Sequence, residues 1–182
     1  MSIFLLLSQV FVFAQDFSEG PFSQLIIRGV TLINGNGAPP RGPIDVVIEE
    51  DKITKIAVVG YPGIEIEYKK RPKLKKGGKE IDASGMYLLP GFIDMHGHIG
   101  GTSQGADWNY VFKLWLAHGI TTVREPGGRG LKYALELKKR SETNEIIAPT
   151  IITYTFFGQG AKNGINNPEQ AREWVRLNKK NG

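Results

Sequence analysis

Cysteine is absent from the 182 residues of the chain. Disulfide frameworks, thiolate metal sites and a cysteine nucleophile are therefore excluded together. The absence does not fix the compartment, because many exported proteins carry no disulfide. Metal binding through other ligands remains open.

Aromatic residues are missing from the most basic stretch of the chain. The formal net charge is +5, and much of the excess comes from one group of residues: Lys69, Lys70, Arg71, Lys73, Lys75, Lys76 and Lys79. A platform that stacks nucleic-acid bases needs interleaved aromatic side chains. We therefore predict a solvated surface loop rather than a polyanion site, and no nucleic-acid partner.

Long hydrophobic runs are also absent, and the strongly apolar run at the N-terminus, Ile3 to Phe13, is short for a bilayer span. Val12 and Ala14 supply small residues at positions −3 and −1 of a signal-peptidase site. These features predict a signal peptide over residues 1–14, export to the periplasm or the extracellular space, and no stable membrane anchor. No Lys or Arg precedes the run, so a buried strand or helix remains the alternative.

A β-rich segment follows a predicted linker over residues 15–24. Apolar alternation and turn residues predict six short strands: Leu25–Ile33, Ile44–Ile48, Lys52–Val59, Ile64–Tyr68, Glu80–Ala83 and Met86–Leu89. Short antiparallel strands of this kind predict a small β-sandwich over residues 25–87.

The pattern then changes to strands alternating with helices. The predicted order is strand Leu88–Met95, helix Trp108–His118, strand Ile120–Val123, helix Leu131–Arg140, strand Thr150–Tyr154 and helix Pro168–Leu177. Such alternation predicts a parallel α/β arrangement. A closed (β/α)8 TIM-type barrel needs about 250 residues. We therefore expect residues 88–182 to form the first three β/α units of an incomplete barrel.

Three polar residues end the first strand of this α/β part. Asp94, His96 and His98 are two positions apart, so in a strand they share one face. Two imidazoles about 7 Å apart along a strand can bind one metal ion, and neutral imidazole suits Zn²⁺, Fe²⁺, Ni²⁺ or Mn²⁺. Asp94 could fix the tautomer of a ligand imidazole as a supporting carboxylate.

A His-x-His pair alone is weak evidence, because two histidines on a solvent-facing strand are unremarkable. Here the pair ends an apolar strand at the start of a parallel α/β segment, where barrel active sites lie. We therefore predict that His96 and His98 bind a divalent transition metal, with Zn²⁺ as the first choice and one or two ions.

The segment from Leu88 to His98 resembles the first barrel strand of the amidohydrolase superfamily. Gly119 to Gly128 is similar to the second strand and following loop of its imidazolonepropionase-like branch. The segments Gly29–Gly35 and Lys52–Ile56 resemble the N-terminal part of that family's β-sandwich. The resemblance covers nearly everything after the predicted signal peptide.

The resemblance implies a metal-dependent hydrolase that cleaves amide, cyclic amide or peptide C–N bonds with a metal-activated water. It also implies further ligands on later strands: a carboxylated lysine or a glutamate on the fourth, histidines on the fifth and sixth, and an aspartate on the eighth. Only His96 and His98 can be carried over as ligands, so we assign no catalytic residue within these 182 residues. We expect an N-terminal fragment that turns over no substrate by itself.

Other polar residues are weaker candidates. His118 ends a predicted helix, where a capping role is favoured over a ligand role. Arg124 and Glu125 follow the second strand and either contact substrate or pair with each other. Tyr154 is a further candidate for substrate contact. The glycines of 127–130 do not form a phosphate loop, because no Lys-Ser/Thr follows them.

The leading hypothesis is thus an exported hydrolase with a small-molecule or short-peptide substrate. The alternative is a non-catalytic exported module that binds metal or a protein partner. Unpaired strand edges in an incomplete barrel promote association, so we expect the 182-residue chain to be a homo-oligomer or poorly soluble.

Overall fold

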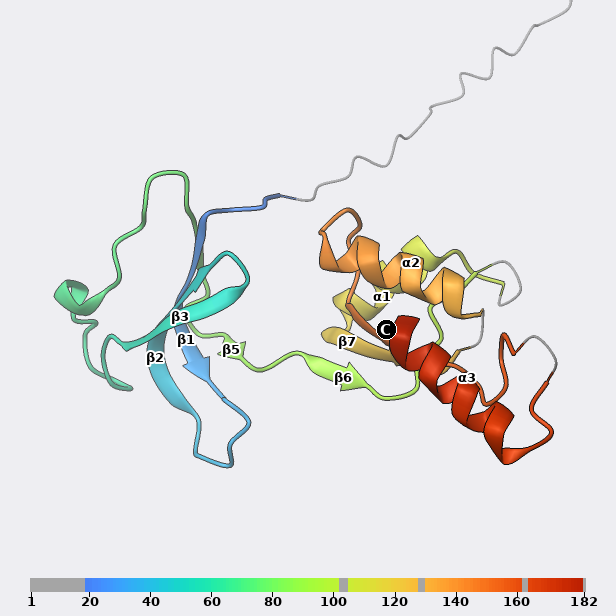
Figure 1. Ribbon diagram of the computed structural model, residues 1–182. Coiled ribbons are helices and arrows are strands. Elements are labelled where there is room, and N and C mark those ends of the chain that lie inside the picture. Colours follow the sequence, from blue (N-terminus) through green and yellow to red (C-terminus); the bar gives the residue numbers. More distant parts are fainter. Residues whose placement is uncertain (1–18, 102–104, 128–129, 162–163, 182) are drawn as a thin grey trace, which may run out of the picture. The chain divides into compact units, whose positions relative to one another are not determined.

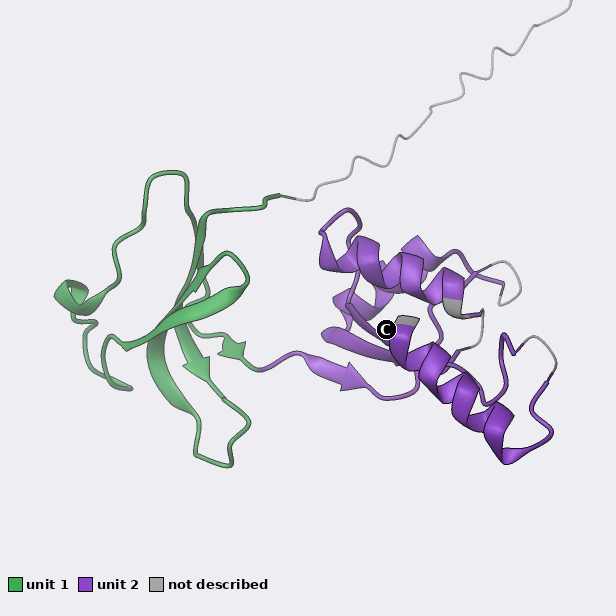
Figure 2. Cartoon of the chain, in the orientation of Figure 1, with its two compact units in different colours: residues 1–89 green, residues 90–182 purple. Residues whose placement is uncertain are grey.

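The chain forms two compact units, which divide between Leu89 and Pro90 (Figures 1 and 2). The computed structural model describes residues 19–101, 105–127, 130–161 and 164–181. The predicted signal peptide therefore lies outside the described residues. Of the helices that are described, none combines the length and apolar character needed to cross a membrane.

Unit 1 is built on a five-stranded sheet. Its strands are β1 (Gln24–Leu32), β2 (Arg41–Glu49), β3 (Lys52–Val58), β4 (Lys79–Asp82) and β5 (Tyr87–Leu88). β1 pairs with β2 and β2 pairs with β3, both antiparallel. The β2–β3 turn is tight, and Glu50 adopts a positive φ of 54° there.

Two expectations for unit 1 are wrong. β4 and β5 both pair with β1 in parallel, so the sheet is mixed rather than antiparallel. Ile64–Tyr68 is not a strand: a short 3-10 helix, Tyr68–Lys70, begins at its last residue. Ile and Glu alternate there, but Ile64 is 65% exposed, and a strand also needs a neighbour for its backbone hydrogen bonds. Glu67 N does donate to Val59 O at 2.7 Å, yet no ladder follows.

The core of unit 1 explains why these strands form. Alternate apolar residues of β1 and β2 are buried together with one residue of the segment between β4 and β5: Val30, Leu32, Ile44, Val46 and Ala83. Burial of β-branched side chains on one face of a pleated sheet is the main stabilising term for such strands.

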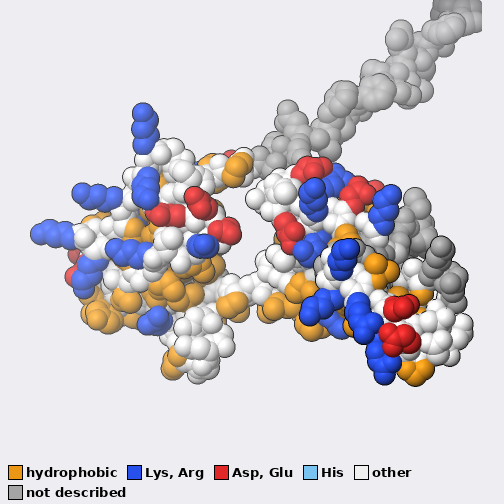
Figure 3. Space-filling model, in the orientation of Figure 1, with side chains coloured by type: hydrophobic (Ala, Val, Ile, Leu, Met, Phe, Trp, Pro, Cys, Tyr) orange, Lys and Arg blue, Asp and Glu red, His pale blue; other side chains and the backbone are white. Residues whose placement is uncertain are grey.

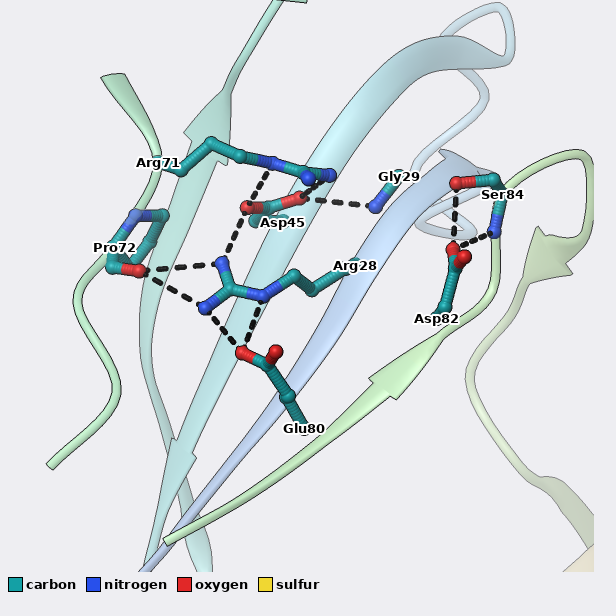
Figure 4. A network of polar contacts seen from close by, with 8 residues as sticks. All are labelled: Arg28, Gly29, Asp45, Arg71, Pro72, Glu80, Asp82 and Ser84. Carbon is teal, nitrogen blue, oxygen red and sulfur yellow. Dashed lines mark hydrogen bonds and ion pairs between the residues drawn. The ribbon is translucent and has the colours of Figure 1, made fainter. Parts of the chain in front are cut away.

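A buried carboxylate ties the basic stretch to the sheet (Figure 4). The Asp45 side chain is fully buried, and it forms ion pairs with Arg28 at 2.9 Å and with Arg71 at 3.1 Å. Its Oδ1 also accepts a hydrogen bond from Gly29 N at 2.9 Å. Burial opposes the charged form of Arg28, but its bonds to Glu80 and Asp45 outweigh this and raise its pKa.

The lysines of the basic stretch are exposed, as predicted for a solvated loop. Three of them pair with carboxylates: Lys70 with Glu67, Lys75 with Glu49 and Lys79 with Glu19, at 2.7, 2.7 and 2.9 Å. On the face that Figure 3 draws, Lys and Arg side chains of unit 1 project at several separate places. Arg71 differs from its neighbours, because it is held against the buried Asp45.

Unit 2 contains a three-stranded parallel sheet in the order β6-β7-β8. The strands are β6 (Phe92–Asp94), β7 (Ile120–Glu125) and β8 (Thr150–Thr153), and the helices are α1 (Trp108–Ala117), α2 (Leu131–Glu142) and α3 (Pro168–Asn181). The predicted alternation of parallel strands and helices is confirmed. The chain is thus a mixed α/β protein, whereas the β-sandwich and the barrel stay predictions.

Local signals place the helices. Asp107 caps α1 by accepting a hydrogen bond from Asn109 N at 2.8 Å. Asn167 does the same for α3 by accepting a hydrogen bond from Gln170 N at 3.0 Å. α1 and α2 contribute Phe112, Ala134 and Leu137 to a core that also holds Ile99, Val123 and Ile151. Two of the tryptophans, Trp108 and Trp115, pack against this core.

The predicted single strand Leu88–Met95 is wrong in its extent. Pro90 and Gly91 interrupt it, so β5 belongs to the sheet of unit 1 and β6 to that of unit 2. β6 also ends at Asp94 rather than Met95. His96 and His98 therefore lie beyond the strand, in a turn and the segment after it.

Candidate metal site

The end of β6 is shaped by a side-chain hydrogen bond. Asp94 Oδ1 accepts a hydrogen bond from His96 N at 2.9 Å, which closes a local turn. Aspartate commonly competes with regular structure in this way, because its carboxylate offers the backbone a local partner. The argument that Asp94, His96 and His98 share one face of a strand is therefore wrong. Asp94 contacts the backbone of His96 instead.

The turn nevertheless brings the two histidine rings together. The ring centroids of His96 and His98 are 5.4 Å apart, and the planes meet edge-on at 84°. Both residues are exposed. They follow the carboxyl end of β6, the edge at which parallel α/β proteins place their binding residues.

Glu125 lies behind His98. It is the last residue of β7, and its side chain is 1% exposed, against 40% for His98. Glu125 Oε1 is 3.5 Å from His98 Nδ1. Glu125 Oε2 accepts a hydrogen bond from Ile99 N at 2.7 Å. One buried carboxylate thus contacts both the second histidine and the backbone that follows it.

Backbone contacts with β7 hold the histidine segment. Gly97 N donates to Arg124 O at 3.1 Å, and the Ile99 side chain is fully buried in the core of unit 2. Gly97 has no room for a side chain, because an added Cβ would meet Val123 and would lie 2.9 Å from Trp115. The segment from His96 to Ile99 therefore lies close against β7 and α1.

Arg124 and Tyr154 form a second group at this edge of the sheet. The Arg124 guanidinium lies 3.9 Å from the centroid of the Tyr154 ring, a cation–π distance. Its Nη1 donates to Met95 O at 3.3 Å. Arg124 and Glu125 therefore contact different groups, as adjacent residues of a strand do when they point to opposite faces. Contact of Arg124, Glu125 or Tyr154 with substrate stays a prediction.

His118 takes the local role that was favoured for it. It is the C-cap residue of α1, and its Nδ1 lies 2.7 Å from Leu114 O in the last turn. The ring thus makes a second contact with a carbonyl that also accepts a hydrogen bond from His118 N at 3.2 Å.

The donor set around His96 fits a metal in part. Two neighbouring exposed imidazoles with a buried carboxylate behind one of them is a usual arrangement for a transition-metal site. Within the part of the chain that the structure describes, no group of three or more His, Cys, Asp and Glu side chains is arranged to hold a metal ion. His96 and His98 would therefore supply two ligands, and any others must come from elsewhere.

The contact between Glu125 and His98 is not predicted by the sequence analysis, which gives the supporting position to Asp94. A signal was present, because Val123 and Glu125 are two residues apart and therefore share a face of β7. That face packs into the core, and both residues are buried. The sequence predicts that the strand ends at Val123, so the alternation of buried and exposed side chains is not followed as far as Glu125.

A mixed α/β fold is shared by many classes of protein, and comparison with known proteins is more specific. The sequence is 32% identical over 104 residues to N-acetylglucosamine-6-phosphate deacetylase of Lysinibacillus sphaericus, covering 57% of this chain and 22% of that protein. It is 33% identical over 93 residues to adenine deaminase 2 of Desulfotalea psychrophila, covering 46% of this chain and 16% of that protein. No family model matches the sequence.

Solved structures show the same fold. An amidohydrolase superposes with a TM-score of 0.61 at 16% identity, covering 87% of this chain and 45% of that one. A Xaa-Pro dipeptidase superposes with a TM-score of 0.58 at 22% identity, covering 88% and 45%. The predicted resemblance to the amidohydrolase superfamily is borne out by the sequence relatives and by the shared fold. Its sequence relatives are hydrolases acting on C–N bonds, and it spans only a minor part of their lengths.

Proposed function

We propose that this chain carries the first metal-ligand pair of an exported, metal-dependent amidohydrolase of the imidazolonepropionase-like branch. The substrate class is a small molecule or short peptide with an amide, cyclic amide or related C–N bond. In this proposal residues 25–87 belong to a β-sandwich and residues 88–182 to the first three units of a TIM-type barrel. The metal is a divalent transition ion, with Zn²⁺ as the first choice.

The observation that carries the proposal is the pairing of the His96 and His98 rings at 5.4 Å beyond the carboxyl end of a parallel strand. Arg124 and Tyr154 lie at the carboxyl ends of the next two strands, at the same edge, where substrate groups would approach. The activities named for the sequence relatives support C–N bond hydrolysis.

When bound, the metal would lower the pKa of a water molecule and polarise the carbonyl of the substrate. The chain's own residues bind and orient the reacting groups. His96 and His98 provide ring nitrogens for the metal, and the stacked Arg124 offers a cation for a polar substrate group. Proton transfer is assigned to no residue of this chain, because the resemblance places that group on a later strand.

Metal binding by single histidine variants tests the proposal. The 182-residue protein is titrated with Zn²⁺ in competition with a chromophoric chelator. We expect His96→Ala and His98→Ala each to reduce affinity at least tenfold, because each removes a ligand. His118→Ala is the matched control, since that ring contacts the helix carbonyl of Leu114, and its affinity should equal that of the unaltered protein. Equal affinity in all four proteins would overturn the metal-site assignment.

A non-catalytic exported module that binds metal or a protein partner is the second candidate. It is favoured by one observation: among the described residues, no group of three or more His, Cys, Asp and Glu side chains is arranged to hold a metal ion. Sequencing the encoding DNA beyond the codon for Gly182 separates the two. A frame that continues with further His and Asp at strand ends supports the hydrolase, whereas an immediate stop codon supports the binding module.

A further inference from the structure

We infer that Glu125 is the positioning residue of the metal site, and that it holds His98 in the tautomer whose Nε2 is available to the metal. The inference rests on the proposed function, since it assigns a task to a residue of the same site. Glu125 is not a ligand in this assignment. It acts through the ring of His98.

The two oxygens of Glu125 have different partners. Oε2 accepts a hydrogen bond from Ile99 N at 2.7 Å, and a backbone N–H can only donate. This bond orients the carboxylate, and Oε1 then faces His98 Nδ1 at 3.5 Å. That separation is longer than a usual N–H···O bond, so we assign it an electrostatic preference rather than a strong hydrogen bond.

The preference selects a tautomer. A neutral imidazole carries one proton, either on Nδ1 or on Nε2, and the nitrogen without it has the lone pair that binds a metal. A carboxylate beside Nδ1 favours the proton there, which leaves the Nε2 lone pair free. Carboxylates that face the second nitrogen of a ligand histidine act in this way in many metal sites.

Glu125 is well placed to act as a fixed support. It is 1% exposed, whereas the histidine that it faces is 40% exposed. Its backbone is anchored in the sheet, where its carbonyl accepts a hydrogen bond from Tyr154 N at 3.2 Å. The segment that it holds is fixed by Ile99, whose side chain is buried in the core. A preorganised ligand loses less conformational entropy on binding.

Replacement of the carboxylate by an amide tests this geometry. In Glu125→Gln the side chain offers one acceptor oxygen and one NH₂ donor. Ile99 N–H requires the oxygen, so the NH₂ would face His98 Nδ1 and favour the tautomer with the proton on Nε2. We expect a change of the His98 tautomer from Nδ1–H to Nε2–H and a loss of Zn²⁺ affinity on the order of 10–100-fold.

The tautomer is read by ¹⁵N NMR of the histidine rings in the metal-free protein at pH 8, above the ordinary histidine pKa of about 6.5. Asp94→Asn is the matched control, because its amide oxygen can still accept from His96 N. It should leave the His98 tautomer unchanged. Glu125→Asp keeps two acceptor oxygens and should retain the Nδ1–H form.

The outcomes separate the two proposals. A His98 ring with its proton on Nε2 in the unaltered protein overturns the inference without any variant, as does an unchanged tautomer in a folded Glu125→Gln protein. If the tautomer changes as expected but the unaltered protein binds no Zn²⁺, the orientation by Glu125 stands and the proposed function fails. If Zn²⁺ binds and Glu125→Gln leaves the His98 tautomer unchanged, the proposed function stands and the inference fails.

Discussion

Asp45 is the residue on which the polar contacts of unit 1 converge. Its carboxylate is fully buried and is satisfied by Arg28, Arg71 and the backbone of Gly29. A buried carboxylate is tolerated only with such partners, since its transfer from water is otherwise costly. The ion pair between Arg71 and Asp45 also holds the start of the basic stretch against β2. Arg71 directly follows the short 3-10 helix.

Asp45→Asn should destabilise unit 1 by about 2–4 kcal/mol, because two guanidinium groups lose their shared buried carboxylate. The free energy of unfolding would be measured by urea denaturation with circular dichroism. Asp51→Asn, at an exposed position in the β2–β3 turn, is the control and should change it by no more than about 0.5 kcal/mol. Equal effects of the two variants would show that the buried pairs contribute nothing.

β6 is the element that matters most for the candidate site, and it is shorter than its apolar pattern predicted. It ends at Asp94 because the carboxylate of that residue takes the backbone N–H of His96. The following segment then continues along β7 through Gly97 and Ile99. The histidines are thus positioned by a turn and by the neighbouring strand rather than by strand alternation.

Gly97→Ala tests how tightly this segment is held. The added methyl group would overlap Val123 and crowd Trp115, and overpacking of this kind costs about 1–3 kcal/mol. We expect lower stability and weaker Zn²⁺ binding, because the segment between His96 and His98 must move away from β7. Urea denaturation followed by tryptophan fluorescence gives the stability, since all three tryptophans lie in unit 2.

The double variant Gly97→Ala/Val123→Ala provides the control for that prediction. Removing the Val123 methyl groups makes room for the added one, so the double variant should be more stable than the sum of the single effects by about 1 kcal/mol. Strict additivity would mean that the close approach at Gly97 does not hold the segment.

At the scale of the whole molecule, acidic side chains in both units predict a loss of stability in acid. The pKa of Glu49 is lowered by its hydrogen bonds with Lys75 and Gln24, that of Asp82 by Ser84, and that of Glu169 by Arg176 and Arg172. A carboxyl group with a lowered folded-state pKa stabilises the fold above its unfolded-state value and loses this effect as the pH falls. The free energy of unfolding should therefore decrease as the pH is lowered below about 4.5.

Variants assign this acid sensitivity to each unit. Glu169→Gln should weaken the fall in the free energy of unfolding at acid pH, measured by tryptophan fluorescence. Both Glu169 and the tryptophans lie in unit 2. Glu49→Gln should leave the acid-pH dependence measured by tryptophan fluorescence unchanged, since Glu49 lies in unit 1. Stability that rises on acidification would contradict the assignment.

Association is the second prediction for the whole chain. In the described part of unit 2, β6 and β8 are the outer strands of the sheet. They expose large apolar side chains: Phe92 at 61%, Ile93 at 59% and Ile152 at 50%. Outer strands with exposed apolar residues promote association. We expect oligomers or poor solubility in size-exclusion chromatography of the 182-residue chain, and a stable compact monomer would contradict this.

The sequence by itself determined what depends on nearby residues. The helices of unit 2 follow from periodicity over a few residues. The histidine pair at the end of the first strand of unit 2 follows from a spacing that is equally local. The resemblance around Asp94 to the amidohydrolase superfamily also needed only a continuous motif. The same local reasoning predicts a strand longer than β6. Apolar alternation does not show where a side chain such as Asp94 will accept a hydrogen bond from the backbone.

Only the tertiary structure decided which distant residues meet. Arg28 contacts Asp45 across 17 positions and Arg71 contacts it across 26, and Glu125 reaches Ile99 across 26. These pairings depend on the register of β1 against β2 and on the path of the chain after β6 along β7, which hydrophobic patterns leave open. Asp45 is therefore the carboxylate that pairs with Arg28 and Arg71, and Glu125 is the carboxylate that faces His98. Both contacts join residues that are close in space but far apart along the chain.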